Sequence, residues 1–185
     1  MSTQPLEQAI SVARNVLDGV SAEQLSASTP CASWTVAELI NHMVGGQSFF
    51  AACVNGEMPS GEAPDHASGE FRAAFDEQSS ACLAAFRADG AMAKTVTAPF
   101  GEMPAPAFMG LAITDTFQHA WDLAKATGQD TDLAPELASA LLDQARANIS
   151  DNFRGPEGAP FGPEQPVDEN ASPADQLAAF LGRAV

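Results

Sequence analysis

The sequence is short of positive charge. Its 185 residues contain eight lysines and arginines against 24 aspartates and glutamates, which gives a formal net charge of −16 at pH 7. Proteins that bind nucleic acid or anionic membrane surfaces need a positively charged face, so we expect neither kind of partner. The excess of negative charge is typical of a protein that stays soluble in the cytosol.

Cysteines and long apolar runs are also scarce. The chain has three cysteines, Cys31, Cys53 and Cys82, at wide spacings and without a CxxC pair, so a disulfide framework or a cysteine-rich zinc site is not expected. No apolar run approaches the roughly 18–20 residues of a membrane span. The N-terminus lacks the basic and apolar segments of a signal peptide. We therefore expect a cytoplasmic protein with reduced thiols.

Apolar residues recur at three- and four-residue steps, which predicts helices. The first carries Leu6, Ile10, Ala13 and Leu17. Local signals then predict a second helix from Thr35 to about Val54. A third has Phe71, Phe75, Cys82 and Phe86 on its apolar face and ends near Asp89-Gly90. A fourth over residues 105–127 stops at Gly128, Pro135 opens a fifth, and a short last helix follows Ser172. Residues 94–104 could hold a short strand. This pattern predicts an all-α antiparallel four-helix bundle with an additional short C-terminal helix.

One domain is expected over residues 1–185. The bundle core would occupy about residues 4–150, and an extended arm with the last helix would occupy residues 151–185. Clusters of Gly, Pro and Ser predict a loop over residues 55–69 and the arm over residues 155–166.

The fourth helix carries an acid and an imidazole on a face that looks apolar. Asp115 and His119 are four residues apart and share a stripe with Phe108, Leu111 and Ala112. Burying an unpaired carboxylate is costly, so a hydrogen-bonded pair, an opposite charge or a metal ion must compensate it. A plain Asp–His pair without a metal is one of these alternatives.

His42 lies on the inward face of the second helix, next to Gly45 and Gly46. Two successive glycines are poor helix formers, and here they indicate that bulk is kept away for a ligand or for a close helix contact. Helical bundles build metal sites from imidazole and carboxylate groups on facing helices. Two histidines and one carboxylate would also leave coordination positions open, as a catalytic metal requires. His42, Asp115 and His119 are thus the candidate ligands.

Other candidates are weaker. Asp122 could orient His119 or could be a solvated residue near the helix end. Trp34 and Trp121 are expected to pack in the core, although either could form a pocket wall. Cys31 precedes the second helix and could approach the site, but a packing role is favoured. His66 sits among loop residues. Cys53 lies 11 residues beyond His42, about 16 Å along the helix axis, and cannot share a metal with it.

Three motifs resemble one family. The segment TPCASWTVAELINHMVGG (residues 29–46) is similar to the TPCxxW…NHxVGG signature of actinobacterial proteins that carry the N-terminal domain of mycothiol-dependent maleylpyruvate isomerase, within the DinB-like superfamily. The segment DTFQHAWDLAKATGQ (residues 115–129) resembles the family's DxxxHxWDLA segment. The tail, FGPEQPVDENASPADQLAAFLGR, resembles its closing pattern.

This resemblance implies a DinB-like bundle that holds a divalent metal on His42, Asp115 and His119. Where the isomerase has Glu, this chain has Asp115, which is one methylene shorter. The isomerase has a C-terminal domain that we do not expect in this chain, which ends at Val185. The closer resemblance is therefore to single-domain, metal-binding members. Bundles of this superfamily often pair, so a homodimer is an expectation.

The resemblance favours an enzyme in which a metal, zinc first and otherwise Ni, Fe or Mn, activates a low-molecular-weight thiol. That thiol, mycothiol, would attack a small electrophile in a transferase or isomerase reaction. The alternatives are a metal-dependent hydrolase, a non-enzymatic metal- or ligand-binding stress protein, and a bundle without metal. The walls of the substrate pocket are expected from loops such as residues 55–69 and 98–106.

Overall fold

The fold was analysed in a computed structural model of the chain. It describes residues 2–31, 34–58, 64–155 and 161–185. Part of the predicted loop over residues 55–69 and most of the first half of the predicted arm lie outside the described residues.

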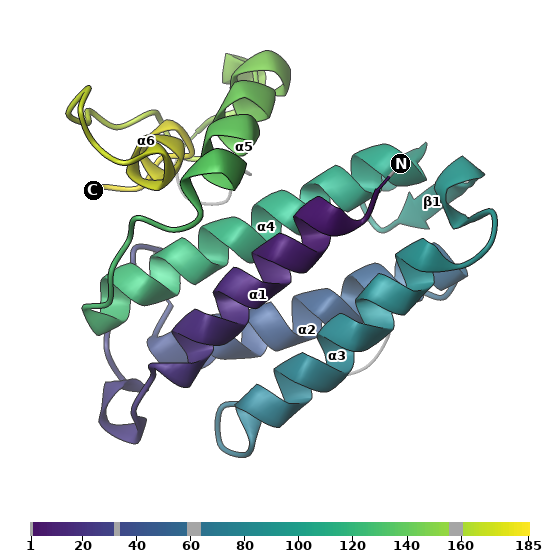
Figure 1. The fold of residues 1–185 in the computed structure, drawn as a ribbon, viewed down its shortest axis with the longest axis horizontal. Coiled ribbons are helices and arrows are strands. Elements are labelled where there is room, and N and C mark those ends of the chain that lie inside the picture. The colour runs from purple at the N-terminus through teal and green to yellow at the C-terminus, as the bar shows by residue number, and fades with distance from the viewer. Residues whose placement is uncertain (1, 32–33, 59–63, 156–160) are drawn as a thin grey trace.

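Six α-helices make up most of the described chain (Figure 1). They are α1 (Gln4–Asp18), α2 (Val36–Asn55), α3 (Phe71–Arg87), α4 (Ala105–Thr127), α5 (Pro135–Asn148) and α6 (Pro173–Phe180). The strands β1 (Thr95–Ala98) and β2 (Gly101–Pro104) pair as an antiparallel hairpin before α4. None of the described helices combines the length and apolar character that a membrane crossing requires.

Helices α1 to α4 form the bundle, and ion pairs show their directions. Arg87 at the end of α3 pairs with Glu7 at the start of α1, and Arg72 at the start of α3 pairs with Asp18 at the end of α1. These two helices are therefore antiparallel. The site described below shows that α2 and α4 are antiparallel as well, whereas α2 and α3 run in the same direction (Figure 1). The predicted all-α, DinB-like bundle is confirmed.

Local capping explains where the helices begin and end. Thr35 accepts a hydrogen bond from the Glu38 amide, and the Glu38 carboxylate accepts one from the Thr35 amide. This is the predicted capping box at the start of α2. At the end of α4, Gly128 has φ 71°, a left-handed conformation that glycine adopts without strain. Ser172 accepts from the Asp175 amide and starts α6.

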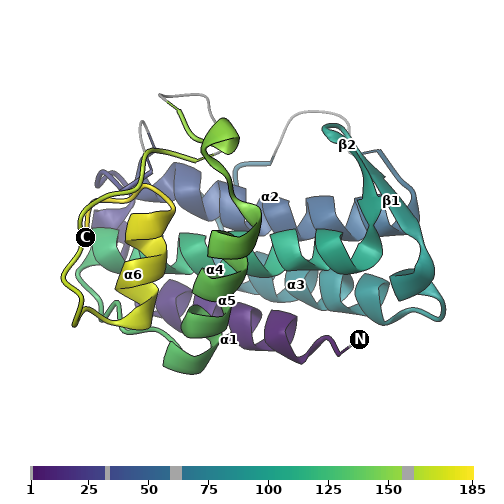
Figure 2. The same cartoon turned by 90° about the horizontal axis from the view of Figure 1, so that it is seen from above.

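Helices α5 and α6 pack against each other outside the bundle and cross α1 and α4 (Figure 2). The indole of Trp121 in α4 donates to Asp175 in α6 at 2.8 Å. Arg154 donates to the backbone oxygens of Gly162 and Phe180. These contacts hold the C-terminal segment beside the middle of α4, where it borders the candidate site.

Candidate metal centre

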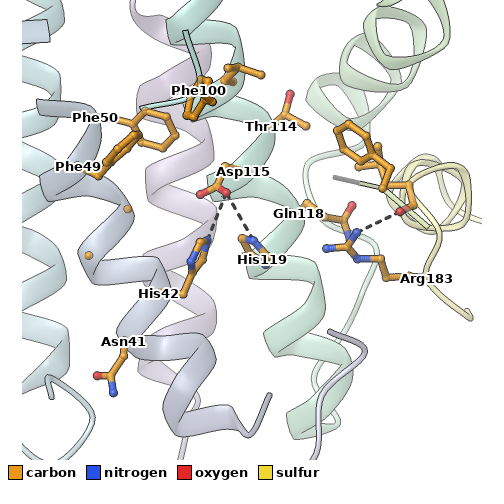
Figure 3. Close-up of a pocket in the computed structure, with 15 residues that line it drawn as sticks. Asn41, His42, Phe49, Phe50, Phe100, Thr114, Asp115, Gln118, His119 and Arg183 are labelled. Carbon is orange, nitrogen blue, oxygen red and sulfur yellow. Dashed lines mark hydrogen bonds and ion pairs between the residues drawn. The ribbon is translucent and has the colours of Figure 1, made fainter. Parts of the chain in front are cut away.

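Helices α2 and α4 bring the three predicted ligand residues together (Figure 3). His42 Nε2 lies 3.3 Å from Asp115 Oδ1, and His119 Nε2 lies 3.5 Å from the same oxygen. The imidazole rings meet edge to face, with centroids 4.5 Å apart. Residue 42 therefore faces the region of residues 115–119, while Gln47, further along α2, donates to Thr116 at 2.7 Å. His42 and Asp115 are far apart in the sequence, and helix packing alone brings them together.

The electrostatics of the metal-free site are dominated by Asp115. Burial would raise the pKa of this carboxyl group, but His119 and His42 lower it far below its usual range. Burial would likewise lower the pKa of His119, whereas the contacts with Asp115, Asp122 and Cys31 raise it well above its ordinary value. The negative charge of Asp115 and the positive charge of His119 therefore compensate each other. An unpaired carboxylate at this position would destabilise the folded protein.

Asp122 lies one turn beyond His119 and has no exposed side-chain surface. Its Oδ2 lies 3.0 Å from His119 Nδ1, and Arg183 donates to both of its oxygens, from Nε at 3.2 Å and from Nη2 at 3.1 Å. Burial would raise the pKa of Asp122, but His119 and Arg183 lower it to about 2. The carboxylate is therefore ionised, and it directs Nε2 of His119 toward Asp115 by accepting at the opposite ring nitrogen.

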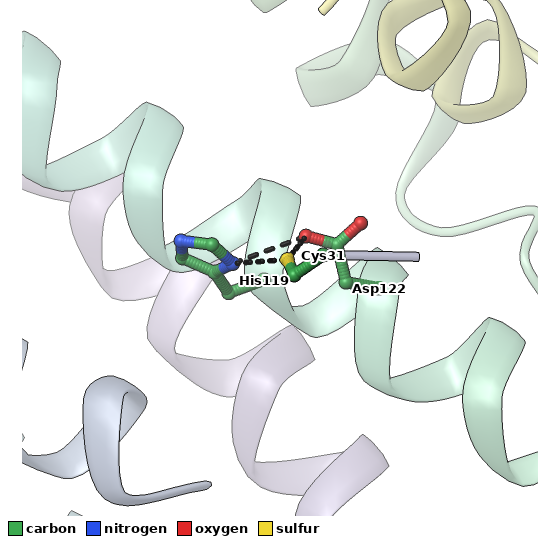
Figure 4. Close-up of side chains that lie close together, drawn as sticks. All are labelled: Cys31, His119 and Asp122. Atoms are coloured by element: carbon green, nitrogen blue, oxygen red, sulfur yellow. Dashed lines mark hydrogen bonds and ion pairs between the residues drawn. The ribbon is translucent and has the colours of Figure 1, made fainter. Parts of the chain in front are cut away.

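Cys31 completes this second cluster (Figure 4). Its Sγ lies 3.0 Å from Asp122 Oδ2, 3.6 Å from His119 Nδ1 and 3.8 Å from Arg183 Nη2. The thiol of Cys31 and the carboxylate of Asp122 both approach Nδ1 of His119. The three groups therefore do not form a proton relay, which would need one partner at each ring nitrogen. A cation placed here would face the guanidinium of Arg183, which disfavours this cluster as a metal site.

The cluster of His42, Asp115 and His119 does fit a divalent metal. Each residue offers one ligand atom, and these atoms lie within 4.8 Å of one another. Imidazole and carboxylate donors suit Zn and also Ni, Fe or Mn. At Gly46 of α2, an added Cβ would lie 3.4 Å from Asp115 Oδ2, in contact with this candidate ligand.

A cavity of about 680 Å³ opens beside these residues. Aromatic and aliphatic side chains make up much of its wall, and they come from Phe49, Phe50, Phe100, Leu111, Phe161 and Leu181. Leu111 is 41% exposed at the cavity rather than packed in the core with Phe108 and Ala112, its predicted neighbours on the stripe. Polar groups are concentrated at the end where the imidazoles and Asp115 lie (Figure 3). A concave, mostly apolar site with few convergent polar groups is typical of small-molecule binding.

Comparison with known proteins assigns the family. Residues 6–124 match the mycothiol maleylpyruvate isomerase N-terminal domain. The chain belongs to this family. The matched range contains all three candidate ligands and Asp122, whereas Arg183 and the rest of the C-terminal segment lie beyond it.

The chain is also similar to two uncharacterized proteins of Mycobacterium tuberculosis, from strain CDC 1551 / Oshkosh and strain ATCC 25618 / H37Rv. Each is 45% identical over 170 residues, which cover 92% of this chain and 91% of the relative. No solved structure shows a significant match. Family membership was predicted correctly from the motifs.

The structure places the remaining predicted residues at different distances from the centre. The Trp34 ring lies beside both imidazoles, with centroids 4.8 Å from His42 and 5.8 Å from His119. Trp121 is fully buried and packs in the core, as expected. The alternative that placed Asp122 in solvent is wrong, because tertiary contacts bury it.

Neither His66 nor Cys53 belongs to a described cluster of metal-ligating side chains. The prediction that loops form the walls of the substrate pocket was correct in part. The hairpin of residues 98–106 contributes Phe100 to the cavity, but no described residue of 55–69 lines it. Helices and the C-terminal segment supply the other walls.

Sequence reasoning missed Gln118 and Arg183. For Cys31 it favoured a packing role over an approach to the site, and the structure shows the less favoured alternative, because the thiol contacts His119 and Asp122. Gln118 was not singled out, although it precedes His119 and lines the cavity. Arg183 was also overlooked. The only sequence signal for it was its place at the end of the family-like tail pattern.

Proposed function

We propose that this member of the isomerase N-terminal domain family is a metal- and thiol-dependent transferase or isomerase that acts on a small electrophile. His42, Asp115 and His119 would hold the divalent metal, with zinc as the first expectation. The observation that carries the proposal is the convergence of two imidazoles and a carboxylate on one wall of a largely apolar cavity. The family name supports mycothiol as the thiol.

A divalent metal supplies a Lewis acid that lowers the pKa of a thiol, so that the nucleophilic thiolate is present near neutral pH. The residues of the chain perform the remaining tasks. Asp122 keeps the Nε2 atom of His119 directed at the centre by accepting at Nδ1. Phe49, Phe50 and Phe100 border the reaction space with apolar surface, which excludes water and strengthens electrostatic interactions inside it.

Arg183 is not available to bind an anionic group of a substrate. Among the described residues that line the cavity, it is the one lysine or arginine. Its Nε and Nη2 atoms already donate to Asp122, and Nη1 donates to the Leu181 carbonyl. A compensating charge for an anionic group would therefore come from the bound metal rather than from this guanidinium.

The test starts with chelator-treated protein that is reloaded separately with Zn²⁺, Ni²⁺, Mn²⁺ or Fe²⁺. Each form is incubated with mycothiol and a panel of neutral and anionic electrophiles, and thiol adducts or isomerised products are identified by mass spectrometry. We expect product with at least one metal and a loss of at least about 100-fold in His42→Ala, because one of three protein ligands is removed.

His66→Ala is the matched control, since this histidine lies outside the cluster, and it should retain activity. No product with any metal would contradict the proposal. Incorporation of oxygen from labelled solvent water into a product would instead favour a metal-dependent hydrolase.

A further inference from the structure

Gln118 in α4 has a side-chain oxygen that nothing in the described chain satisfies. The residue is 3% exposed, and its Nε2 donates to Asp122 Oδ1 at 3.3 Å. Both oxygens of Asp122 accept from the Arg183 guanidinium, so the Gln118 amide turns its nitrogen to that carboxylate and its oxygen away. No donor among the described residues reaches Oε1.

Buried carbonyl groups without a donor are rare in folded proteins, so each one calls for a physical account. Gln47 Oε1 is the other such atom among the described side chains. Gln47 donates to Thr116 in the helix interface and does not line the cavity. Gln118 does line it, and Figure 3 shows its amide between His119 and Arg183. A molecule in the cavity can therefore approach Gln118 but not Gln47.

Asp122 and Arg183 hold the side chain of Gln118 in place. Asp122 binds its amide nitrogen and is itself fixed by the two contacts from Arg183. The last torsion of a glutamine side chain is soft. Rotation about this torsion can therefore turn Oε1 toward a ligand in the cavity.

We propose that Gln118 Oε1 is the acceptor for a hydrogen-bond donor of the thiol that occupies this cavity. The inference rests on the proposed function and narrows its substrate class to thiols with an amide N–H or a hydroxyl group a few bonds from the sulfur. Gln118 is then a specificity-determining residue. A site that satisfies a buried acceptor through its ligand rejects an analogue that lacks the donor, because the acceptor stays unpaired.

Two probes test the proposal. N-acetylcysteamine carries an amide N–H two carbons from its thiol, and its ketone analogue has a methylene in place of that N–H on the same skeleton. Dissociation constants are measured by isothermal titration calorimetry on the full chain loaded with Zn²⁺. We expect N-acetylcysteamine to bind about tenfold more tightly than the ketone analogue.

The same pair of probes is measured on Gln118→Met and on Gln47→Met, both checked for zinc content and for helical content by circular dichroism. Gln118→Met should bind the two thiols equally. Gln47→Met removes the buried acceptor that does not face the cavity, and it should keep the preference for the amide.

The outcomes separate the two proposals. Equal affinities in the unmodified protein overturn the role of Gln118 and leave thiol binding intact. A preference that persists in Gln118→Met also overturns it. Failure of both thiols to bind the zinc-loaded protein overturns the proposed function and this inference together. If Gln118→Met does not fold, the comparison in the unmodified protein can still overturn the proposal, because equal affinities contradict it.

Discussion

Asp122→Asn tests whether the buried carboxylate behind His119 stabilises the fold and orients the site. The wild-type carboxylate accepts from Arg183 at 3.1 and 3.2 Å and contacts His119 Nδ1 at 3.0 Å. Asparagine removes the charge and places an NH₂ group where one oxygen accepted. Arg183, whose side chain is 17% exposed, would then lack its partner in a mostly buried position.

Two physical arguments set the magnitude. The pKa of Asp122 falls from 3.8 to about 2 in the folded chain, which corresponds to about 2.5 kcal/mol in favour of the folded state with the carboxylate ionised. Removing one partner of a buried ion pair costs about 3–5 kcal/mol. We expect the variant to lose about 3 kcal/mol of unfolding free energy without metal. That loss lowers Tm by about 6–12 °C in a protein of this size.

Urea denaturation of metal-free protein near neutral pH, with chelator present, measures this loss. Asp132→Asn changes an exposed carboxylate and should lose less than about 0.5 kcal/mol. The folded pKa of Asp122 lies below the unfolded one, so its contribution is complete above about pH 4 and disappears as the pH falls through about 2. The difference between wild type and Asp122→Asn should therefore shrink over that interval.

A loss below about 1 kcal/mol would refute the reasoning, since it would mean that Arg183 does not depend on this carboxylate. A difference that stays constant from neutral pH to pH 2 would refute it as well. A further readout is zinc affinity by chelator competition, which should fall about 10- to 100-fold because His119 loses the group that orients it.

Further predictions concern the metal site, the two glycines of α2 and the cysteines. Protein purified without an affinity tag should hold about one equivalent of divalent metal by elemental analysis, and alanine at any of the three proposed ligands should abolish this occupancy. Gly45→Ala, whose Cβ would meet nothing within 4 Å, should raise the unfolding free energy by up to about 1 kcal/mol without changing zinc affinity. Gly46→Ala, which places a methyl group 3.4 Å from Asp115, should weaken zinc binding severalfold in the same competition assay. Iodoacetamide should modify Cys31 in the native protein and spare Cys82, because burial leaves Cys82 with no exposed surface and raises the pKa of its thiol to about 12. Peptide mapping that finds Cys82 modified before unfolding would contradict this last prediction.

The helices could be predicted because their signals are local. The Thr35 capping box, the glycine that ends α4 at Gly128 and the serine cap at Ser172 act within one turn of the chain. Each satisfies backbone groups that a helix end leaves unpaired, whatever the rest of the protein does. The predicted C-terminal end of α4 agrees with the structure for the same reason.

Part of the candidate site was predictable as well. Asp115 and His119 are neighbours in any helix, because residues four apart lie on one face. His42 could be selected because it lies on an inward face beside Gly45 and Gly46, and the family motifs matched the same positions. The proximity of His42 to the pair, however, depends on the packing of α2 against α4.

The contacts that hold Asp122 beside His119 could not be predicted from local sequence patterns. Arg183 is 61 residues from Asp122, and Cys31 is 91 residues from it. No helical period or spacing relates these groups, and Asp122 could not be placed in the interior until the C-terminal segment was seen to cover it. The buried acceptor on Gln118 likewise appears only when its surroundings are known.

The order of residues thus determined the helices, the pair on α4 and the family, because each depends on neighbours in the chain or on motifs within it. Packing determined the rest: which imidazole faces Asp115, which cation neutralises Asp122 and which side chains enclose the cavity. These features arise from the burial of apolar surface between helices far apart in the sequence, a driving force that is not directional and therefore leaves no local pattern to read.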